Sequence, residues 1–382
     1  MIADQEEHFI VTRKHKKCAL MRAQIKLLLL VALLMILSFV YFSKNENGDN
    51  VTVGVTDTAH SENANNDYVN CFRDKKINSI RLEEILRSDR LPRKDKTIFF
   101  HVTNCLSNGF LDLNSRQSCA IESAALKNPS FDVFVLFASP TFFPETIRSP
   151  AILSLLRYRN VFLRNNNLWN YTKDTPAEEW FKSGALFKSF FVTAHVSDFL
   201  RLMTLWRWGG IYMDLDVIVK ESFETIDLNF AGAESDILVA NGVMSFDSSG
   251  FGHYIVDLIL KKFIGDFRGD IWAHNGPSRI TGVLMNDICK TNVTRNMTAE
   301  RCHGFQVFPV NKFYAIHYSI WNYFFEEKFL SQTLEMTKDS LLIHVWNKMS
   351  SESKFKVGTQ AAYGVYAEKF CPLIYSSIGE YF

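Results

Sequence analysis

Two carboxylates stand one residue apart at the end of the stretch Trp208–Asp216, after a glycine pair and a short apolar run. The pattern predicts a buried strand that carries Asp214 and Asp216 at its end. Residues i and i+2 of a strand point to the same side, so the two carboxylates would converge while Leu215 turns into the core. Converging carboxylates are costly unless a positive group lies between them. A hard divalent cation that also holds phosphate oxygens meets this requirement, and the stretch therefore predicts an Asp-x-Asp site for a metal ion and a diphosphate.

A helix is expected over residues 190–207, directly before the acidic stretch. Its apolar positions recur at three- and four-residue spacing, as in Val192, Val196, Phe199, Leu200, Met203 and Trp206. Asp198 and Arg201 are neighbours on the surface of such a helix. An isolated pair of this kind is usually a solvated salt bridge. Next to a diphosphate site, the aspartate can instead accept hydrogen bonds from sugar hydroxyls, and the arginine can offset phosphate charge.

Gly209 and Gly210 allow two interpretations. They can end the helix, or they can let the backbone approach a ligand closely. We treat both, together with Tyr212, as candidate donor-binding positions. Farther along, Asn241–Met244 and His274–Pro277 are interpreted as ordinary turns.

A second strand is expected in the stretch Ser340–Asn347, near the end of the chain. It would place His344 and Trp346 on one side. The imidazole of His344 could then bind the cation and the indole of Trp346 could contact a sugar face, although a lone histidine is more often structural.

The remaining pattern indicates how these elements are positioned. Strands are expected at Thr97–Val102, Asp132–Phe137 and Val161–Leu163, and a helix at Arg116–Lys127. Strands that alternate with helices indicate an α/β fold with a mostly parallel sheet and helices on both faces. Ligands of such sheets bind beyond the carboxyl ends of the strands, where the acidic pair would lie.

The N-terminal part predicts a membrane anchor. Residues 27–42 are apolar except for Ser38, six basic residues precede them, and only Lys44 follows closely. This charge bias predicts a cytoplasmic N-terminus and a translocated remainder. A cleaved signal peptide is the alternative, but no Ala-x-Ala-like cleavage site follows. We therefore expect a cytoplasmic tail (1–26), a transmembrane signal anchor (27–42), a flexible lumenal stem (43–70) and a lumenal catalytic domain (71–382).

The cysteines fit an oxidising compartment. Cys18 precedes the expected anchor and six cysteines follow it, which permits three disulfides. Many pairings are conceivable. Proximity in sequence favours Cys105–Cys119 and Cys289–Cys302, which leaves Cys71–Cys371. Four N-glycosylation patterns, at Asn50, Asn170, Asn292 and Asn296, agree with this topology.

The composition of the chain and the absence of several known enzyme motifs exclude some classes of protein. The chain has 382 residues, 47% of them hydrophobic, so it can form one large domain or two smaller ones. A net charge of +1 gives no electrostatic reason to expect a nucleic-acid partner. The glycine-rich dinucleotide, Walker A, serine-elbow and zinc-protease motifs are absent. Two other classes stay open: a phosphotransferase that uses Asp214 as its nucleophile, and a non-enzymatic lectin or chaperone on an enzyme-like fold.

A family resemblance rests on the assembled motifs. Ser197-Asp198-x-x-Arg201 followed by Gly209–Asp216 resembles the DXD-sugar glycosyltransferases of family 32. Further segments resemble its α1,4-galactosyl/N-acetylglucosaminyltransferase branch, so that the resemblance extends over about residues 97–371; these segments are Cys119–Pro129, Phe267–Pro277, Asn311–Tyr314 and His344–Trp346.

The resemblance implies a GT-A fold, a UDP-Gal or UDP-GalNAc donor, Mn²⁺, a glycosphingolipid acceptor and a Golgi membrane location. Asp214 and Asp216 would bind the metal and act in catalysis, with His344 as a third ligand. Asp198 and Arg201 would hold the donor sugar, and Arg201 would also stabilise developing charge. Transfer with retention would use either an enzyme nucleophile or same-face attack by the acceptor hydroxyl. Association with itself or with other Golgi membrane proteins is a further expectation.

Overall fold

A computed structural model describes residues 69–73, 77–106, 108–147 and 149–382. The expected tail (1–26) and anchor (27–42), Cys18, Asn50 and the stem up to residue 68 lie outside the described residues. Within the described part of the chain, no helix combines the length and apolarity needed to cross a membrane. Val69 and Asn70 belong to a helical turn that continues to Phe72.

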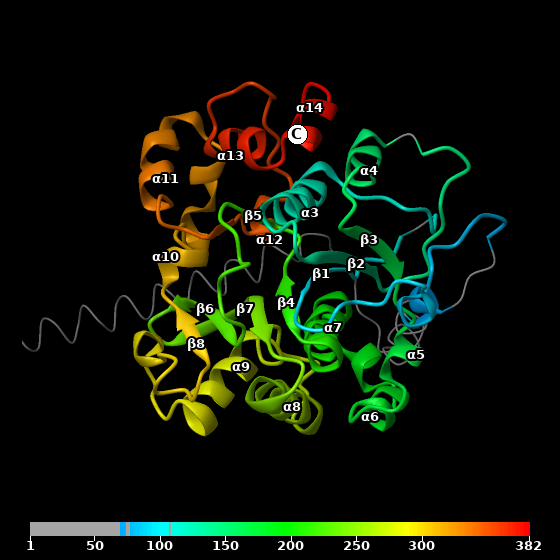
Figure 1. Cartoon of the computed structure of the whole chain (residues 1–382), viewed down its shortest axis with the longest axis vertical. Coiled ribbons are helices and arrows are strands. Elements are labelled where there is room, and N and C mark those ends of the chain that lie inside the picture. The colour runs from blue at the N-terminus through cyan, green and yellow to red at the C-terminus, as the bar shows by residue number, and fades with distance from the viewer. Residues whose placement is uncertain (1–68, 74–76, 107, 148) are drawn as a thin grey trace, which may run out of the picture. The chain divides into compact units, whose positions relative to one another are not determined.

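A seven-stranded mixed sheet forms the centre of the domain (Figure 1). The strands occur in the spatial order β3 (Val161–Asn165), β2 (Asp132–Phe137), β1 (Thr97–Val102), β4 (Gly210–Met213), β7 (Leu238–Phe246), β6 (Phe230–Ser235) and β8 (Gln306–Phe308). The first four are parallel to one another, whereas β7 runs antiparallel to both β4 and β6. The sheet is therefore mixed with flanking helices, as expected for a GT-A type fold. The mostly parallel sheet expected from the alternation of strands and helices is correct only for the first four strands, because β6 and β7 pair as an antiparallel hairpin.

Helices cover both faces of this sheet, as Figure 1 shows for α7 and α8 on one face and α3 and α13 on the other. The described helices are α3 (Ser115–Lys127), α4 (Pro150–Leu155), α5 (Leu168–Thr172), α6 (Glu178–Lys182), α7 (Val192–Trp208), α8 (Gly250–Gly265), α9 (Pro277–Val283), α10 (Val310–Phe313), α11 (Leu330–Met336), α12 (Asn347–Ser350), α13 (Ala362–Phe370) and α14 (Pro372–Ser377). Short 3₁₀ or π turns are η1 (Ile85–Arg87), η2 (Ala185–Lys188), η3 (Leu284–Ile288), η4 (Thr294–Asn296), η5 (Tyr318–Phe324) and η6 (Glu327–Phe329).

Strand β1 shows why the sheet is buried on both sides. All six of its residues are buried, as expected for a central strand of a parallel sheet. Ile98 and Phe100 pack into the core beneath α3, α13 and α14, while Phe99 packs into the opposite core with α7 and α8. The predicted strands β1 and β2 match their observed bounds, and the predicted helices correspond to α3 and α7.

A small second sheet brings the C-terminal part of the chain to the acidic stretch. It pairs β5 (Val217–Val219) with β9 (Leu342–His344) in antiparallel fashion. Val217 is the register partner of His344, and the backbone amide of Val345 donates to the carbonyl of Asp216 at 2.9 Å. The pairing therefore fixes His344 beside the residue that precedes β5.

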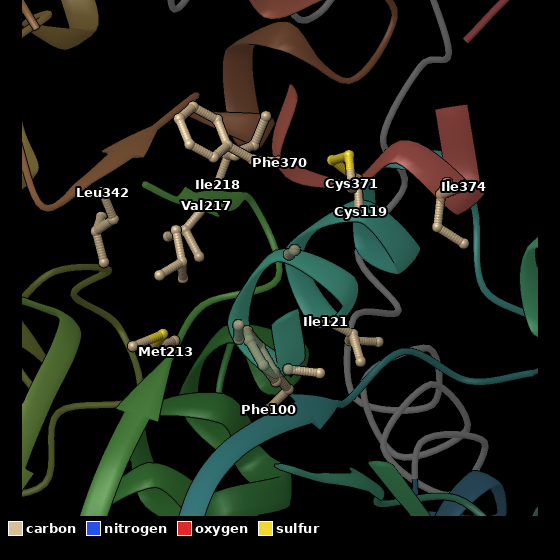
Figure 2. Packing of buried hydrophobic residues seen from close by; sticks show 14 of the residues in the cluster. Phe100, Cys119, Ile121, Met213, Val217, Ile218, Leu342, Phe370, Cys371 and Ile374 are labelled. Atoms are coloured by element: carbon tan, nitrogen blue, oxygen red, sulfur yellow. A yellow bond between two sulfur atoms is a disulfide. The ribbon is translucent and has the colours of Figure 1, made fainter. Parts of the chain in front are cut away.

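Three disulfides link the six cysteines of the described domain, as predicted, but two of the proposed pairings are wrong. The pairs are Cys71–Cys105, Cys119–Cys371 and Cys289–Cys302. Cys119 and Cys371 belong to the same hydrophobic core, where α3 meets the junction of α13 and α14 (Figure 2). Cys105 lies beyond the end of β1, next to the N-terminal turn. Proximity in sequence gave the wrong partner for Cys119 because α3 places this residue next to Cys371, near the C-terminal end of the chain.

We expect removal of the Cys119–Cys371 disulfide to destabilise the full chain more than removal of Cys289–Cys302. The sequence separations are 252 and 13 residues, and a longer closed loop removes more entropy from the unfolded chain. The double variant Cys119→Ala/Cys371→Ala should lose about 2–5 kcal/mol of unfolding free energy. Chemical denaturation measures this loss. All four cysteines are buried, so Cys289→Ala/Cys302→Ala is a matched control, and an equal or larger loss in that control would contradict the expectation.

Candidate functional site

The acidic pair lies in a turn rather than in a strand. Strand β4 ends at Met213, and Asp214, Leu215 and Asp216 connect it to β5. The backbone amide of Asp214 donates to the carbonyl of Gly242 at 2.8 Å, which extends the β4–β7 pairing by one residue. Leu215 packs against the hydrophobic core. The strand-based explanation of the convergence is therefore wrong, but the turn still brings the two carboxylates together.

Asp214, Asp216 and His344 form a group that could hold a metal ion, since one ligand atom from each lies within 4.8 Å of the others. The Nε2 atom of His344 is 3.1 Å from Asp216 Oδ1 and 3.9 Å from Asp214 Oδ2. The backbone amide of Asn347 donates to Asp216 Oδ2 at 2.7 Å. The predicted ligand set is thus assembled by the β4–β5 turn and the β5–β9 pairing.

The pKa of His344 shows how strongly the carboxylates of Asp214 and Asp216 attract positive charge. Burial would lower the pKa of His344, but Asp216 and Asp214 outweigh it and raise the pKa to about 10. Burial would likewise raise the pKa of Asp216, yet His344 and hydrogen bonds bring the pKa below its usual value. In the metal-free protein a protonated imidazole therefore offsets part of the negative charge of the two carboxylates. Two carboxylates and an imidazole suit divalent cations of the Mn²⁺ or Zn²⁺ kind.

Arg201 is a buried cation that joins α7 to the acidic turn. Its Nη1 atom is 3.3 Å from Asp214 Oδ1 and donates to the carbonyl of Asn241 at 2.8 Å. Its Nη2 atom donates to Ser197 Oγ at 2.7 Å. The guanidinium lies over the ring of Tyr212, 4.7 Å from the ring centroid. Burial would lower the pKa of Arg201, but the carboxylate of Asp214 and its neighbours raise it, so the side chain stays charged.

Asp198 lies one helical turn before Arg201 and faces the same space. Its Oδ1 atom accepts a hydrogen bond from Asn241 Nδ2 at 2.7 Å and is 3.7 Å from Arg201 Nε. A Cβ atom on Gly276 would lie 2.6 Å from the same oxygen, so only glycine fits there. Burial raises the pKa of Asp198, with Arg201 opposing the shift. The predicted surface pair is instead part of a buried polar network.

The predicted donor-binding positions are not all in one place. The hydroxyl of Tyr212 donates to Asp214 Oδ1 at 2.6 Å, which places this residue at the acidic turn. Gly209 and Gly210 lie at the opposite end of β4 from the acidic turn, where each approaches other parts of the chain closely; their assignment to donor binding stays a prediction. A Cβ atom on Gly209 would clash with Asp95 Oδ1, and one on Gly210 with the carbonyl of Thr97, each within 2.4 Å. Both adopt positive φ angles, and their role is to end α7 and start β4.

Two further residues, Asn241 and Tyr314, belong to the site, although the sequence patterns indicated no role for either. Asn241 and Gly242 lie inside β7 and not in a turn, and Asn241 binds both Asp198 and Arg201. A polar residue within the apolar run Leu238–Phe246 was the available signal. Tyr314 is buried, and its ring contacts that of His344 at 5.3 Å. Among the described residues its hydroxyl has no hydrogen-bond partner.

Trp346 differs from its predicted role. It follows β9 with a left-handed backbone conformation, and its indole nitrogen donates to the carbonyl of Ile316 at 2.8 Å. Its ring packs against Tyr314 and Tyr318. These contacts hold the indole within the protein, so it supports His344 and is not positioned as a free sugar platform.

Two protein families match this chain, each over one of two neighbouring segments. The glycosyltransferase sugar-binding region containing the DXD motif matches residues 114–235, which include the acidic turn and α7. The α1,4-glycosyltransferase conserved region matches residues 248–378, which include His344. Together these segments contain most residues of the site described above.

Curated relatives share about a quarter of their residues with this chain. Lactosylceramide 4-α-galactosyltransferase of Rattus norvegicus is 26% identical over 279 residues, which cover 71% of this chain and 76% of the relative. Human α-1,4-N-acetylglucosaminyltransferase is 28% identical over 282 residues, 70% of this chain and 79% of the relative.

Similar solved structures include a galactosyltransferase, LgtC, determined with donor and acceptor sugar analogues. It has a TM-score of 0.40 and 12% identity, and the match covers 73% of this chain and 95% of that one. The PaToxG glycosyltransferase has a TM-score of 0.37 and 14% identity, covering 85% of this chain and all of that chain.

We expect a divalent cation to displace a proton when it binds at this site. The pKa of His344 is raised from its ordinary 6.5 to about 10, so the side chain is protonated in the folded protein at pH 8. A cation must remove this proton to bind Nε2, and its apparent affinity should therefore rise with pH. Calorimetric titration with Mn²⁺ at pH 8, in two buffers of different ionisation enthalpy, should report release of close to one proton.

His344→Asn should abolish this proton release, whereas the exposed His303→Asn should not change it. Equal binding enthalpies in the two buffers for the unmodified chain would contradict the expectation.

Proposed function

Because this chain belongs to the glycosyltransferases with a DXD-containing sugar-binding region and an α1,4-glycosyltransferase conserved region, we propose that it makes an α1,4 linkage to a glycosphingolipid. The donor is UDP-Gal or UDP-GalNAc, the acceptor is a non-reducing terminal sugar, and transfer proceeds with retention. The names of the curated relatives support the linkage and the lipid-borne acceptor. The observation that carries the proposal is the Asp214–Asp216–His344 group next to Asp198 and Arg201.

The cation site fits a diphosphate donor. Asp214, Asp216 and His344 would hold Mn²⁺, which supplies Lewis-acid stabilisation of the departing diphosphate. Arg201 is buried and stays charged, and it lies 3.3 Å from the carboxylate of Asp214. Its charge would oppose the negative charge that accumulates on the leaving group. Because its hydrogen bonds to Asn241 and Ser197 fix it in advance, little reorganisation is needed during the reaction.

Asp198 is proposed to bind hydroxyls of the donor sugar. Asn241 orients its carboxylate, and Gly276 leaves the space beside it free of a side chain. Buried carboxylates that accept directed hydrogen bonds discriminate well between sugar epimers, since a lost partner leaves the charge unpaired. The residue therefore belongs to donor selection rather than to bond breaking.

We further infer a GT-A type domain in the Golgi lumen. The acidic turn follows β4, at the position where the parallel part of the sheet meets the antiparallel hairpin, which is a typical place for a ligand in open α/β sheets. Three disulfides in the described domain suit an oxidising compartment. The apolar segment 27–42 would anchor the chain as a single-pass type II membrane protein.

The phosphotransferase alternative has less support. Its nucleophile would have to be Oδ2 of Asp214, because Oδ1 accepts from Tyr212 and lies close to Arg201. The non-enzymatic alternative would not need the buried Arg201 so close to the cation site. Both alternatives also leave the α1,4-glycosyltransferase conserved region without a role.

We expect the full chain to transfer sugar from UDP-Gal or UDP-GalNAc to lactosylceramide when Mn²⁺ is present. Asp216→Asn should lower the rate by at least about 100-fold, because it removes one charge from the cation site and weakens metal binding. Chelation should abolish transfer, and added Mn²⁺ should restore it. Product analysis by NMR should show an α anomer from an α-linked donor.

Asp236→Asn is the matched control, since Asp236 is exposed on the β6–β7 hairpin, with 74% of its side chain accessible. It should leave the rate unchanged. Neither transfer nor donor hydrolysis with UDP-Gal, UDP-GalNAc or UDP-GlcNAc, in a folded sample, would refute the proposal.

A further inference from the structure

One exposed tryptophan lies near the candidate site. Trp272 is 43% exposed, and it is the only exposed tryptophan among the seven of the chain, all of which are in described residues. It belongs to the segment 266–276 between α8 and α9. Tryptophan is enriched at interfaces, where its apolar ring and its polar N–H can both find partners.

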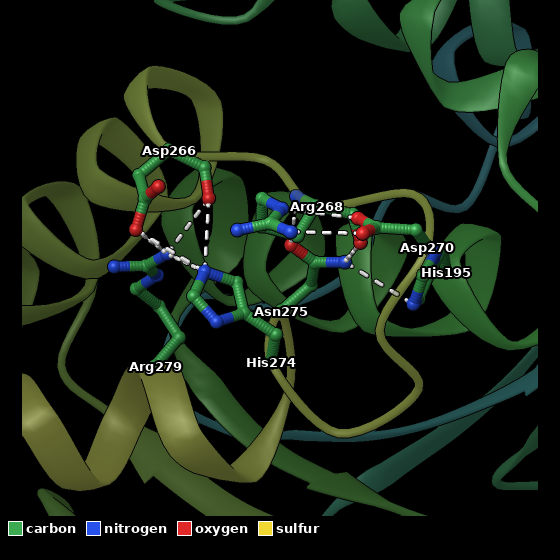
Figure 3. A network of polar contacts seen from close by, with 7 residues as sticks. All are labelled: His195, Asp266, Arg268, Asp270, His274, Asn275 and Arg279. Carbon is green, nitrogen blue, oxygen red and sulfur yellow. Dashed lines mark hydrogen bonds and ion pairs between the residues drawn. The ribbon is translucent and has the colours of Figure 1, made fainter.

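A buried polar network holds this segment in place (Figure 3). Asn275 is fully buried, accepts from the backbone amide of Arg268 at 3.0 Å and donates to the carbonyl of Arg268 at 2.7 Å. His195 of α7 contacts Asn275 at 3.1 Å and the carbonyl of Trp272 at 3.3 Å through Nε2. Its Nδ1 atom is 2.6 Å from Ser189 Oγ. The segment is therefore fixed to α7, and the indole is presented in a defined position before any ligand binds.

Trp272 lies close in sequence or in space to residues of the proposed donor-sugar side and of the proposed metal side of the candidate site. Four residues later, Gly276 lies against the carboxylate of Asp198, on the donor-sugar side. On the other side, Lys348 Nζ lies 3.6 Å from the centroid of the Trp272 ring. Lys348 follows Asn347, whose backbone amide binds Asp216. The segment that carries the indole is thus linked through Gly276 to the residues proposed for the donor sugar, and through Lys348 to those proposed for the metal.

Phe191 and Lys348 are the ring contacts of Trp272 among the described residues. Phe191 contacts the indole at 5.3 Å in an edge-on arrangement, which fixes its tilt. Lys348 lies over a face of the indole, but it is exposed and has a flexible stem, so its ammonium can move off that face and donate hydrogen bonds to the hydroxyls of a ligand that takes its place. Trp346, by contrast, is held by Tyr314 and Ile316. An apolar ring beside a mobile cation is the combination that binds the carbon–hydrogen face and the hydroxyls of a pyranose.

We propose that Trp272 is the stacking platform of an acceptor-sugar subsite, and that Lys348, which lies over the indole in the ligand-free protein, moves to its edge when the sugar binds. The ligand is the terminal β-linked hexose of the acceptor, and its carbon–hydrogen face lies on the indole. This inference rests on the proposed function and deepens it, because the family matches do not assign an acceptor residue. Binding on the indole would place the attacking hydroxyl near the donor sugar held at Asp198.

The test separates the acceptor from the donor. In the full chain, Trp272→Ala should lower kcat/KM for a soluble lactoside on the order of 30-fold, as loss of a central aromatic contact does. Trp272→Phe keeps an apolar face and should lose less. Mn²⁺-dependent UDP binding and donor hydrolysis should stay within about 2-fold of the unmodified chain, because the ring contacts of Trp272 in the described structure are with Phe191 and Lys348 and not with the proposed metal ligands.

Phe190→Ala provides a matched control, since Phe190 is 81% exposed and close in sequence to Phe191. It should leave transfer to the soluble lactoside unchanged. Unchanged transfer in Trp272→Ala would overturn the inference. Equal losses in UDP binding and transfer would also overturn it, because they would indicate that the ring only stabilises the loop. Losses in both Trp272→Ala and Phe190→Ala that occur only with vesicle-borne acceptor would identify a bilayer contact instead.

Direct binding keeps this test independent of turnover. Saturation-transfer NMR of the lactoside, with UDP and Mn²⁺ present, should show a signal for the unmodified chain that Trp272→Ala lacks. If the unmodified chain binds the lactoside in this way but transfers nothing from any donor, the proposed function fails and the subsite stands. If it transfers sugar and Trp272→Ala binds and transfers equally well, the subsite fails and the function stands.

Discussion

The buried guanidinium of Arg201 is the interaction on which this site depends. It lies between the carboxylates of Asp198 and Asp214, and its own side chain is only 7% exposed. Two buried carboxylates without this cation would repel each other and would be strongly destabilised by the loss of water. The desolvated arginine is in turn stable only because the carbonyl of Asn241 and the hydroxyl of Ser197 accept its remaining protons. The buried arginine and the carboxylates beside it are therefore tolerated only while strand β7 and helix α7 keep their positions relative to each other.

The second positive element of the site, the side chain of His344, comes from a distant part of the chain. The β5–β9 pairing brings it to Asp216, and the Cys119–Cys371 disulfide ties α3 to the C-terminal helices that pack over the same core. A cation and a proton compete for the position between the two carboxylates, since the pKa of His344 is raised to about 10. The protein thus folds with part of this negative charge already offset, and a divalent cation that binds displaces the imidazolium proton and adds further positive charge to the site.

Local sequence patterns predicted the helices and strands well, but they predicted contacts between distant segments poorly. Strands β1 and β2 and helix α3 were predicted within a residue, because uniform burial and helical spacing are encoded locally. The acidic pair and His344 were selected from residue type and motif, and the fold brings them together. Two disulfide pairings were wrong because proximity in sequence does not show which distant segments the fold brings together. Asn241 was missed because a polar residue inside β7 has meaning only when α7 packs above it.

The tryptophans show the same limit for the acceptor side. Motif reasoning favoured Trp346, which follows the metal ligand directly, yet a left-handed backbone and a hydrogen bond to Ile316 turn its ring into the protein. Trp272 carries no such motif signal, and its place is set by Asn275 and His195, residues that never reach the ligand space themselves. Binding of the donor needs charged side chains at fixed positions, and these are recognisable as a sequence motif. An acceptor platform needs only an apolar ring at a suitable distance from the donor. Such a ring is defined by the loop that carries it, and the loop is defined by its buried contacts.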